Sequence, residues 1–241
     1  MDFNSQNVYS VEKKDVEFQS FMSRVYSNMA CGLGLSGLVA FLVTKEPLLS
    51  LFYRLTEQGT VSYSWLGWLS LIAPFILVFM IQSETAKMNA TKVQLYFMLF
   101  AALMGVSLSN IFLLYTASSI VQAFLVTGGS FFCLSVYGRV SKRDLSSWGS
   151  FLSMGLFGLI LTVLVNIFFK SSFLTMATSL IGVFIFAGFT VYDTFKMKQI
   201  YQQSSSQEEL DVTAVRGAFS LYLDFINLFM YAVNFLMGER K

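Results

Sequence analysis

The 241-residue chain contains no histidine, and only 12% of its residues are charged. The absence of histidine excludes Ser-His and Cys-His catalysis, His-ligated zinc and histidine-based pH sensing. Any sensing of pH must then come from carboxyl groups. Cysteine is also scarce: Cys31 and Cys133 both lie in apolar segments, which predicts two small packed thiols rather than a metal site or a disulfide.

The composition is that of a membrane protein. Charged residues are about half as frequent as the roughly 25% that is typical of soluble domains. Hydrophobic residues make up 55% of the chain, and the mean hydropathy is +0.63. These values predict a polytopic protein of the lipid bilayer. The net charge is only +2 and no long run of Lys or Arg occurs, so nucleic acid is not expected as a partner.

A transmembrane helix needs about 20 mainly apolar residues. Seven segments have this length, at about 25–43, 65–83, 93–115, 119–138, 149–169, 174–195 and 213–237. Residues 1–24 are polar and of mixed charge, unlike a cleaved signal peptide. We therefore expect an all-α fold in which a polar N-terminal segment, 1–24, precedes a membrane domain of seven helices over 25–241.

The distribution of Lys and Arg between the two sides of the membrane predicts the orientation. Eleven fall on the side of the N-terminus: Lys13, Lys14, Arg24, Lys87, Lys92, Arg139, Lys142, Arg143, Lys196, Lys198 and Arg216. Five fall on the opposite side: Lys45, Arg54, Lys170, Arg240 and Lys241. The N-terminus is therefore expected in the cytoplasm. The serine-rich, acidic stretch 202–211 is then expected to be a solvated cytoplasmic connection.

Two aspartates, Asp193 and Asp224, lie inside the last two apolar segments. A carboxylate at membrane depth costs at least about 2.5 kcal/mol, so such residues usually face a bundle interior or an aqueous cavity. They often mark a path for ions or protons. We therefore consider this pair the best candidate for a functional site.

The last segment carries a polar stripe. Its members follow one another at steps of four, three, four and three residues, which places them on one face of a helix: Ser220, Asp224, Asn227, Tyr231 and Asn234. One interpretation is that Ser220, Asn227, Tyr231 and Asn234 line a pore beside Asp224. The alternative is that they only hold helices together by hydrogen bonds, as asparagine often does in membranes.

The two acids are expected at similar depth. Asp224 lies about 12 Å along the helix from Arg216, at 1.5 Å per residue, and Asp193 lies three residues before Lys196. On antiparallel helices they could meet and share a proton as a coupled pair. The alternative is two separate acids, each satisfied by a lysine or an amide.

Several stretches resemble one protein family. They are VYDTFKMKQIYQ, AFSLYLDFINLFMYAVNFL, LYFMLFAALMGVSLSNIFLLYT and SWGSFL. The chain is similar in these stretches to the Bax inhibitor-1 family (transmembrane BAX inhibitor motif proteins), in its bacterial branch. The resemblance implies six helices around a central seventh. It also implies a pH-sensitive calcium leak channel in a bacterial inner membrane, gated by a di-aspartyl pair on helices six and seven.

By motif, the di-aspartyl pair of the family corresponds to Asp193 and Asp224, which would also bind the permeating calcium transiently through carboxylate oxygens. No cofactor is expected, and calcium and protons are the expected ligands. The resemblance further implies a basic residue on helix two that pairs with the acids in the closed state. Counting back from Gly105 without gaps gives Lys87, with Glu84 nearby. A lysine there lacks the bidentate clamp of an arginine.

Two other functions remain open. An intramembrane aspartyl protease also uses two membrane aspartates, one of them in a Tyr-Asp context like Tyr192–Asp193. Its second aspartate follows Gly-x-Gly, however, whereas Asp224 lies in Tyr-Leu-Asp-Phe, so no enzyme is expected. The third function is that of a non-catalytic adaptor that modulates a membrane protease or another partner, as the resemblance to bacterial relatives implies.

Overall fold

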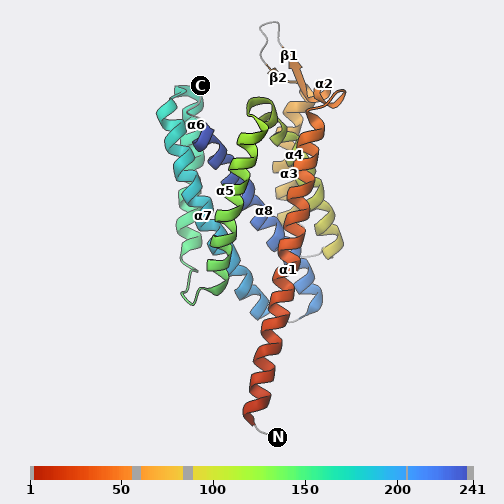
Figure 1. The fold of residues 1–241 in the computed structure, drawn as a ribbon, viewed down its shortest axis with the longest axis vertical. Helices are drawn as coiled ribbons and strands as arrows, with labels where there is room; N and C mark the ends of the chain where they lie inside the picture. Colours follow the sequence, from red (N-terminus) through yellow and green to blue (C-terminus); the bar gives the residue numbers. More distant parts are fainter. Residues whose placement is uncertain (1–2, 56–60, 84–88, 205, 238–241) are drawn as a thin grey trace. The chain divides into compact units, whose positions relative to one another are not determined.

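The computed structural model describes residues 3–55, 61–83, 89–204 and 206–237, and these are almost entirely helical (Figure 1). The elements in chain order are α1 (Phe3–Val43), α2 (Leu48–Phe52), β1 (Tyr53–Leu55), β2 (Val61–Tyr63), α3 (Trp65–Ser83), α4 (Ala90–Leu114), α5 (Ala117–Val140), α6 (Trp148–Phe169), α7 (Ser172–Gln203) and α8 (Gln207–Met237).

Among the described residues, six helices are long and apolar enough to cross a membrane: α1, α4, α5, α6, α7 and α8. The remaining expected span, 65–83, forms α3, which contributes a shorter apolar stretch, Trp65–Val78, among the residues whose side chains are described. The prediction of an all-α, polytopic membrane protein is confirmed. The count of seven crossings stays a prediction.

The structure changes one expectation about the cysteines. Cys31 and Cys133 are both free, as predicted, but both are exposed on their helices. The expectation of two packed thiols is therefore wrong. Both positions lie within helices that can span a membrane, so an exposed thiol there faces an apolar surrounding and behaves as a small hydrophobe.

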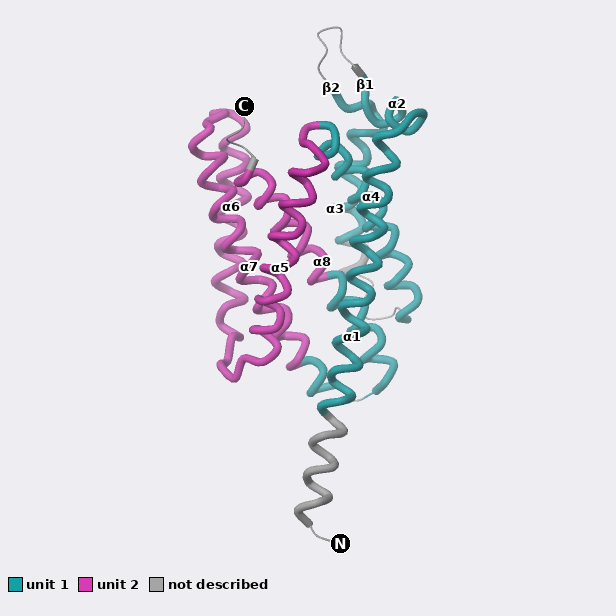
Figure 2. Tube along the Cα trace, in the orientation of Figure 1, with its two compact units in different colours: residues 1–113, 200–219 teal, residues 114–199, 220–241 magenta. Residues whose placement is uncertain are grey.

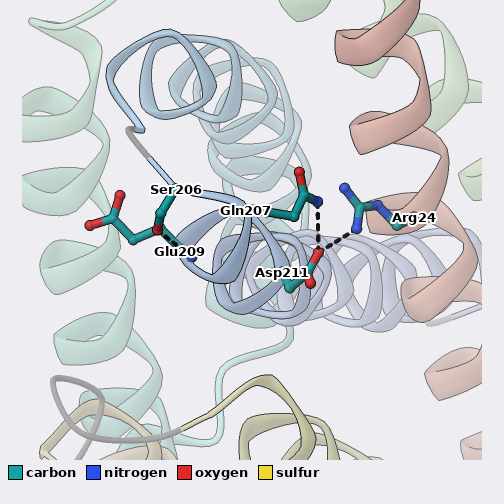
Figure 3. Close-up of polar contacts among 5 residues, drawn as sticks. All are labelled: Arg24, Ser206, Gln207, Glu209 and Asp211. Atoms are coloured by element: carbon teal, nitrogen blue, oxygen red, sulfur yellow. Dashed lines mark hydrogen bonds and ion pairs between the residues drawn. The ribbon is translucent and has the colours of Figure 1, made fainter.

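The helices extend beyond the predicted apolar segments. Helix α1 starts at Phe3, α7 continues to Gln203 and α8 begins at Gln207. The expectation of a loop through 202–211 is therefore wrong at residues 202–203 and from Gln207 onward. The cause is a helix cap: the hydroxyl oxygen of Ser206 accepts the backbone N–H of Glu209 at 3.2 Å (Figure 3).

The chain divides into two compact units, coloured separately in Figure 2. The first comprises residues 1–113 and 200–219, and therefore contains α1 to α4, the β-hairpin and the start of α8. The second comprises residues 114–199 and 220–241, and therefore contains α5, α6, most of α7 and the rest of α8. Helix α1 is continuous through residue 24, and the predicted division there between a polar N-terminal segment and the membrane domain stays a prediction.

In the first unit, α1 and α4 pack closely at Ser36 and Gly105. A Cβ atom added to Gly105 would lie 2.6 Å from the carbonyl oxygen of Ser36, so only glycine fits there. The Ser36 hydroxyl donates to the carbonyl oxygen of Ala101 at 2.7 Å. Small residues and serine hydroxyls are the usual means by which membrane helices approach and bond to one another.

A short hairpin, β1–β2, is fastened to α4 in the same unit. The two strands are antiparallel, with Tyr53 opposite Tyr63. The Tyr53 hydroxyl shares a hydrogen bond of 2.8 Å with the Ser109 hydroxyl, and the Asn110 amide donates to the Tyr63 hydroxyl at 2.9 Å. Burial raises the pKa of Tyr53, so its phenol remains a neutral hydrogen-bonding group.

In the second unit, α5 and α7 meet at Gly138. A Cβ atom added there would lie 2.4 Å from the carbonyl oxygen of Val191. One turn away, the buried hydroxyls of Ser135 and Thr194 are hydrogen-bonded at 3.0 Å. These contacts hold α7 against α5 at Val191 and Thr194, on either side of Asp193.

The close approach at Gly105 makes a stability prediction. Gly105→Ala should lower the stability by about 1–3 kcal/mol, because the new methyl group overlaps the α1 backbone. Gly34→Ala is the matched control, since no atom lies within 4 Å of a Cβ atom added at Gly34. That change should be neutral or stabilise the helix by about 0.5–1 kcal/mol. Thermal unfolding in detergent measures both, and equal effects would contradict the packing.

Candidate functional site

The relative register of α7 and α8 is set by an aromatic contact in the second unit. The rings of Phe186 and Tyr231 stack with centroids 5.7 Å apart and planes inclined by 20°. Gly182, one turn before Phe186, makes room for this contact. A Cβ atom added to Gly182 would lie 2.5 Å from the Tyr231 ring.

The same register brings the two aspartates opposite each other. Asp193 lies seven residues after Phe186, and Asp224 lies seven residues before Tyr231. Seven residues correspond to about two helical turns, so each aspartate shares a face with its aromatic residue. Because the two helices are antiparallel here, both acids lie on the surface where α7 and α8 meet.

Asp193 is half-buried and has polar neighbours on both helices. It accepts a hydrogen bond from the Ser220 hydroxyl of α8. The charge of Lys196, one turn further along α7, also acts on it. The ammonium group of Lys196 lies 5.9 Å from the centre of the Tyr192 ring, which orients this lysine beside the acid.

Asp224 has a different environment. It is only 5% exposed, and its Oδ2 atom has no hydrogen-bond partner among the described residues. Its neighbours along the helix, Leu221, Tyr222 and Phe225, are also buried. A buried polar atom without a partner is rare in native structures and calls for an explanation, such as a functional role or an ion.

The remaining members of the polar stripe diverge along α8. The Asn227 amide donates to the carbonyl oxygen of Leu223 in its own helix at 2.8 Å. Tyr231 packs on Phe186, and Asn234 is exposed. Ser220 and Asp224 are therefore the two stripe residues that the structure brings together with Asp193.

The expected basic residue, Lys87, lies outside the described residues, as does Glu84. In the described part of the chain, Lys196 is a cation whose charge acts on Asp193. The bond between Ser220 and Asp193 was not anticipated from the sequence. The antiparallel alignment of α7 with α8 explains this bond: the alignment that places residue 186 opposite residue 231 also brings residue 193 close to residue 220.

The site can offer oxygen atoms to a hard cation. The two carboxylates and the Ser220 hydroxyl are the kinds of ligand that calcium prefers. Among the described residues, no group of three His, Cys, Asp or Glu side chains could hold a metal ion. Two carboxylates suit brief binding of a passing ion better than tight retention, because calcium usually takes six to eight oxygen ligands.

Removing the Ser220 hydroxyl tests the contact with Asp193. Ser220→Ala should destabilise the protein by about 1.5–3 kcal/mol, the range for a hydrogen bond to a charged group, and Asp193→Asn should reduce this cost. The measurement is a double-mutant cycle on thermal unfolding. Ser153→Ala, an exposed position in the same unit, should change stability by less than about 0.5 kcal/mol. A cost at Ser220 that is independent of residue 193 would contradict the contact.

The chain is similar to known proteins over nearly its whole length. The family model for inhibitors of apoptosis-promoting Bax1 (Bax1-I) matches residues 18–241. An uncharacterised protein of Rickettsia prowazekii is 39% identical over 94% of this chain and 92% of its own length. The inner membrane protein YbhL of Escherichia coli is 37% identical over 96% of this chain and 97% of its own length. An uncharacterised membrane protein of Streptococcus pyogenes is 34% identical over 94% of this chain and 95% of its own length.

Proposed function

Because this chain belongs to the family of inhibitors of apoptosis-promoting Bax1 (Bax1-I), we propose that it forms a pH-sensitive calcium leak in a bacterial inner membrane. The E. coli relative carries the name of an inner membrane protein, which supports this location. The excess of Lys and Arg on the side of the N-terminus supports a cytoplasmic N-terminus. Asp193 and Asp224 form the gate of the leak.

One observation carries the proposal: Asp193 and Asp224 share the surface where α7 and α8 meet, and Asp224 is buried there with an oxygen atom that lacks a partner in the described residues. Two carboxylates in contact cannot both ionise cheaply, so in this proposal they share a proton. Since the chain has no histidine, this pair is the titratable group in the membrane that is best suited to sense pH.

The burial of the helices supports a central position for α8. In its apolar window 56% of residues are buried, compared with 11–39% in the other candidate spans. We propose that α8 is the seventh helix, at the centre of the bundle, and that Ser220 lines the ion path beside the acids. In this proposal, protonation of Asp193 and Asp224 weakens their attraction to a cationic residue of the second predicted membrane helix. That helix then moves and opens the cytoplasmic side.

The acids should determine the pH dependence of calcium flux into liposomes that contain the purified protein. Flux through the unmodified protein should rise as the pH falls. Asp193→Asn and Asp224→Asn should each give a high flux that no longer changes with pH, because an amide resembles the protonated acid and does not titrate. Fluorescence of a trapped calcium indicator, recorded over a series of pH values, measures this.

Asp144 provides the control. It lies in the connection between α5 and α6, where hydrogen bonds from the Ser146 hydroxyl and backbone N–H lower the pKa of Asp144. This acid stays ionised near neutral pH, so Asp144→Asn should keep the normal response. Unchanged flux in both membrane variants would contradict the gate. Partner co-purification that survives both changes would favour an adaptor, and substrate cleavage lost in either would favour a protease.

Lys87 remains the proposed basic partner of the acids. If its ammonium group holds the gate closed, Lys87→Gln should raise the flux at neutral pH to near that of the aspartate variants. Lys87→Arg should lower the flux, because guanidinium can clamp a carboxylate with two hydrogen bonds. Lys92→Gln, a nearby change of equal charge at the start of α4, is the control and should have little effect. An effect of equal size at Lys92 would exclude a specific role for Lys87.

A further inference from the structure

A pocket in the first unit lies apart from the two membrane acids. Its volume is about 420 Å³, within the range of roughly 300–1,000 Å³ that is usual for ligand pockets. It lies between α1 and the segment that joins α7 to α8, and is hereafter the α1–α8 pocket. The lining residues are Glu17, Ser20, Arg24, Tyr201, Gln207 and Leu210.

One wall of the pocket already holds a guanidinium group on a carboxylate. Arg24 of α1 forms an ion pair with Asp211 of α8, and the Gln207 amide donates to the same Asp211 oxygen at 3.2 Å (Figure 3). The two charged side chains are 43% and 42% exposed, so water can reach the pair. An exposed ion pair of this kind adds little net stability, and a competing ion can displace it.

Aromatic rings lie beside this ion pair. The Tyr201 ring contacts Phe18 and Phe21 of α1, with centroid distances of 5.2 and 5.3 Å. Phe21 is fully buried, which fixes the position of the cluster. The face of an aromatic ring attracts cations such as ammonium and guanidinium groups.

The charges favour a cation over an anion. Glu17 of the lining and Asp211 of the ion pair outnumber the single cation Arg24. An anion would meet this excess of negative charge, and Arg24 is already engaged by Asp211. A bound metal ion is not supported either, since the described residues contain no group of three suitable ligands.

We propose that the α1–α8 pocket binds an organic cation, whose primary ammonium or guanidinium group takes the place of Arg24 on Asp211. Glu17 accepts a second hydrogen bond from the ligand, and the Tyr201 ring supports its alkyl chain. The cation comes either from a soluble amine or from a basic side chain of another protein. This proposal does not depend on the calcium leak.

Binding to the full-length protein in nanodiscs tests the pocket, with isothermal titration of spermidine in one arm and of acetyl-Ala-Lys-Ala-amide in the other. Glu17→Gln and Asp211→Asn should weaken binding about fivefold each, the effect of losing one exposed charged contact. Arg24→Gln should strengthen binding about fivefold, because it removes the internal competitor from Asp211. Binding in one arm alone identifies the source of the cation, and either arm supports the pocket.

The matched control is Glu208→Gln. It removes the same charge from the same end of the molecule, but Glu208 is not among the lining residues. A general attraction of cations to an acidic surface would weaken equally in Glu208→Gln and Glu17→Gln, and that result would overturn the proposal. So would the absence of binding of both probes. Glu17 is exposed and outside the ion pair, so its variant keeps the test valid if Arg24→Gln does not fold.

Discussion

The packing of α7 against α8 determines where the carboxyl groups of Asp193 and Asp224 lie in the second unit. Gly182 lets the Tyr231 ring approach α7, and the stack on Phe186 then fixes how the two helices align. Two turns further along, that alignment leaves Asp193 and Asp224 facing the same interface. Lipid offers no hydrogen bonds at membrane depth, so the carboxylates depend on partners within the helices or on an internal aqueous cavity.

The two acids are unequal as a consequence. Asp193 has a hydroxyl donor and the charge of Lys196, whereas Asp224 is buried among apolar side chains with an oxygen atom unpaired in the described residues. An arrangement meant only for stability would be expected to provide a partner for both, because leaving a buried acceptor unpaired costs about 1–3 kcal/mol. The inequality is easier to understand if a proton or a cation occupies this position during function.

Hydrophobicity alone predicted most of the fold. Apolar segments of membrane length recur along the chain; the seven predicted segments all correspond to helices, and among the described residues six of these helices qualify as candidate membrane spans. The helix ends were less predictable, because they depend on caps rather than on hydropathy. The pattern Ser206-x-x-Glu209 is a typical helix start and could have placed the beginning of α8 correctly.

For the candidate site, residue type and helical spacing placed Asp193, Asp224 and Ser220 among the candidates, and their roles stay a prediction. Spacing could not say which stripe residues bond within their own helix, as Asn227 does. That depends on rotamers and on the neighbouring helix. The exposure of Cys31 and Cys133 was not predicted for a similar reason. An apolar helix has a buried face and an exposed face, and composition alone does not show on which of them a cysteine lies.

Within the first unit, the ion pair of Arg24 with Asp211 links the N-terminal part of α8 to α1. The two side chains are 43% and 42% exposed, so water and soluble ions can reach both of them. An exposed pair of this kind adds only about 0–1 kcal/mol of stability, so it can open without unfolding the unit. A competing charge can therefore release this link, and the pocket beside it, rather than the buried core, is where a soluble molecule can bind.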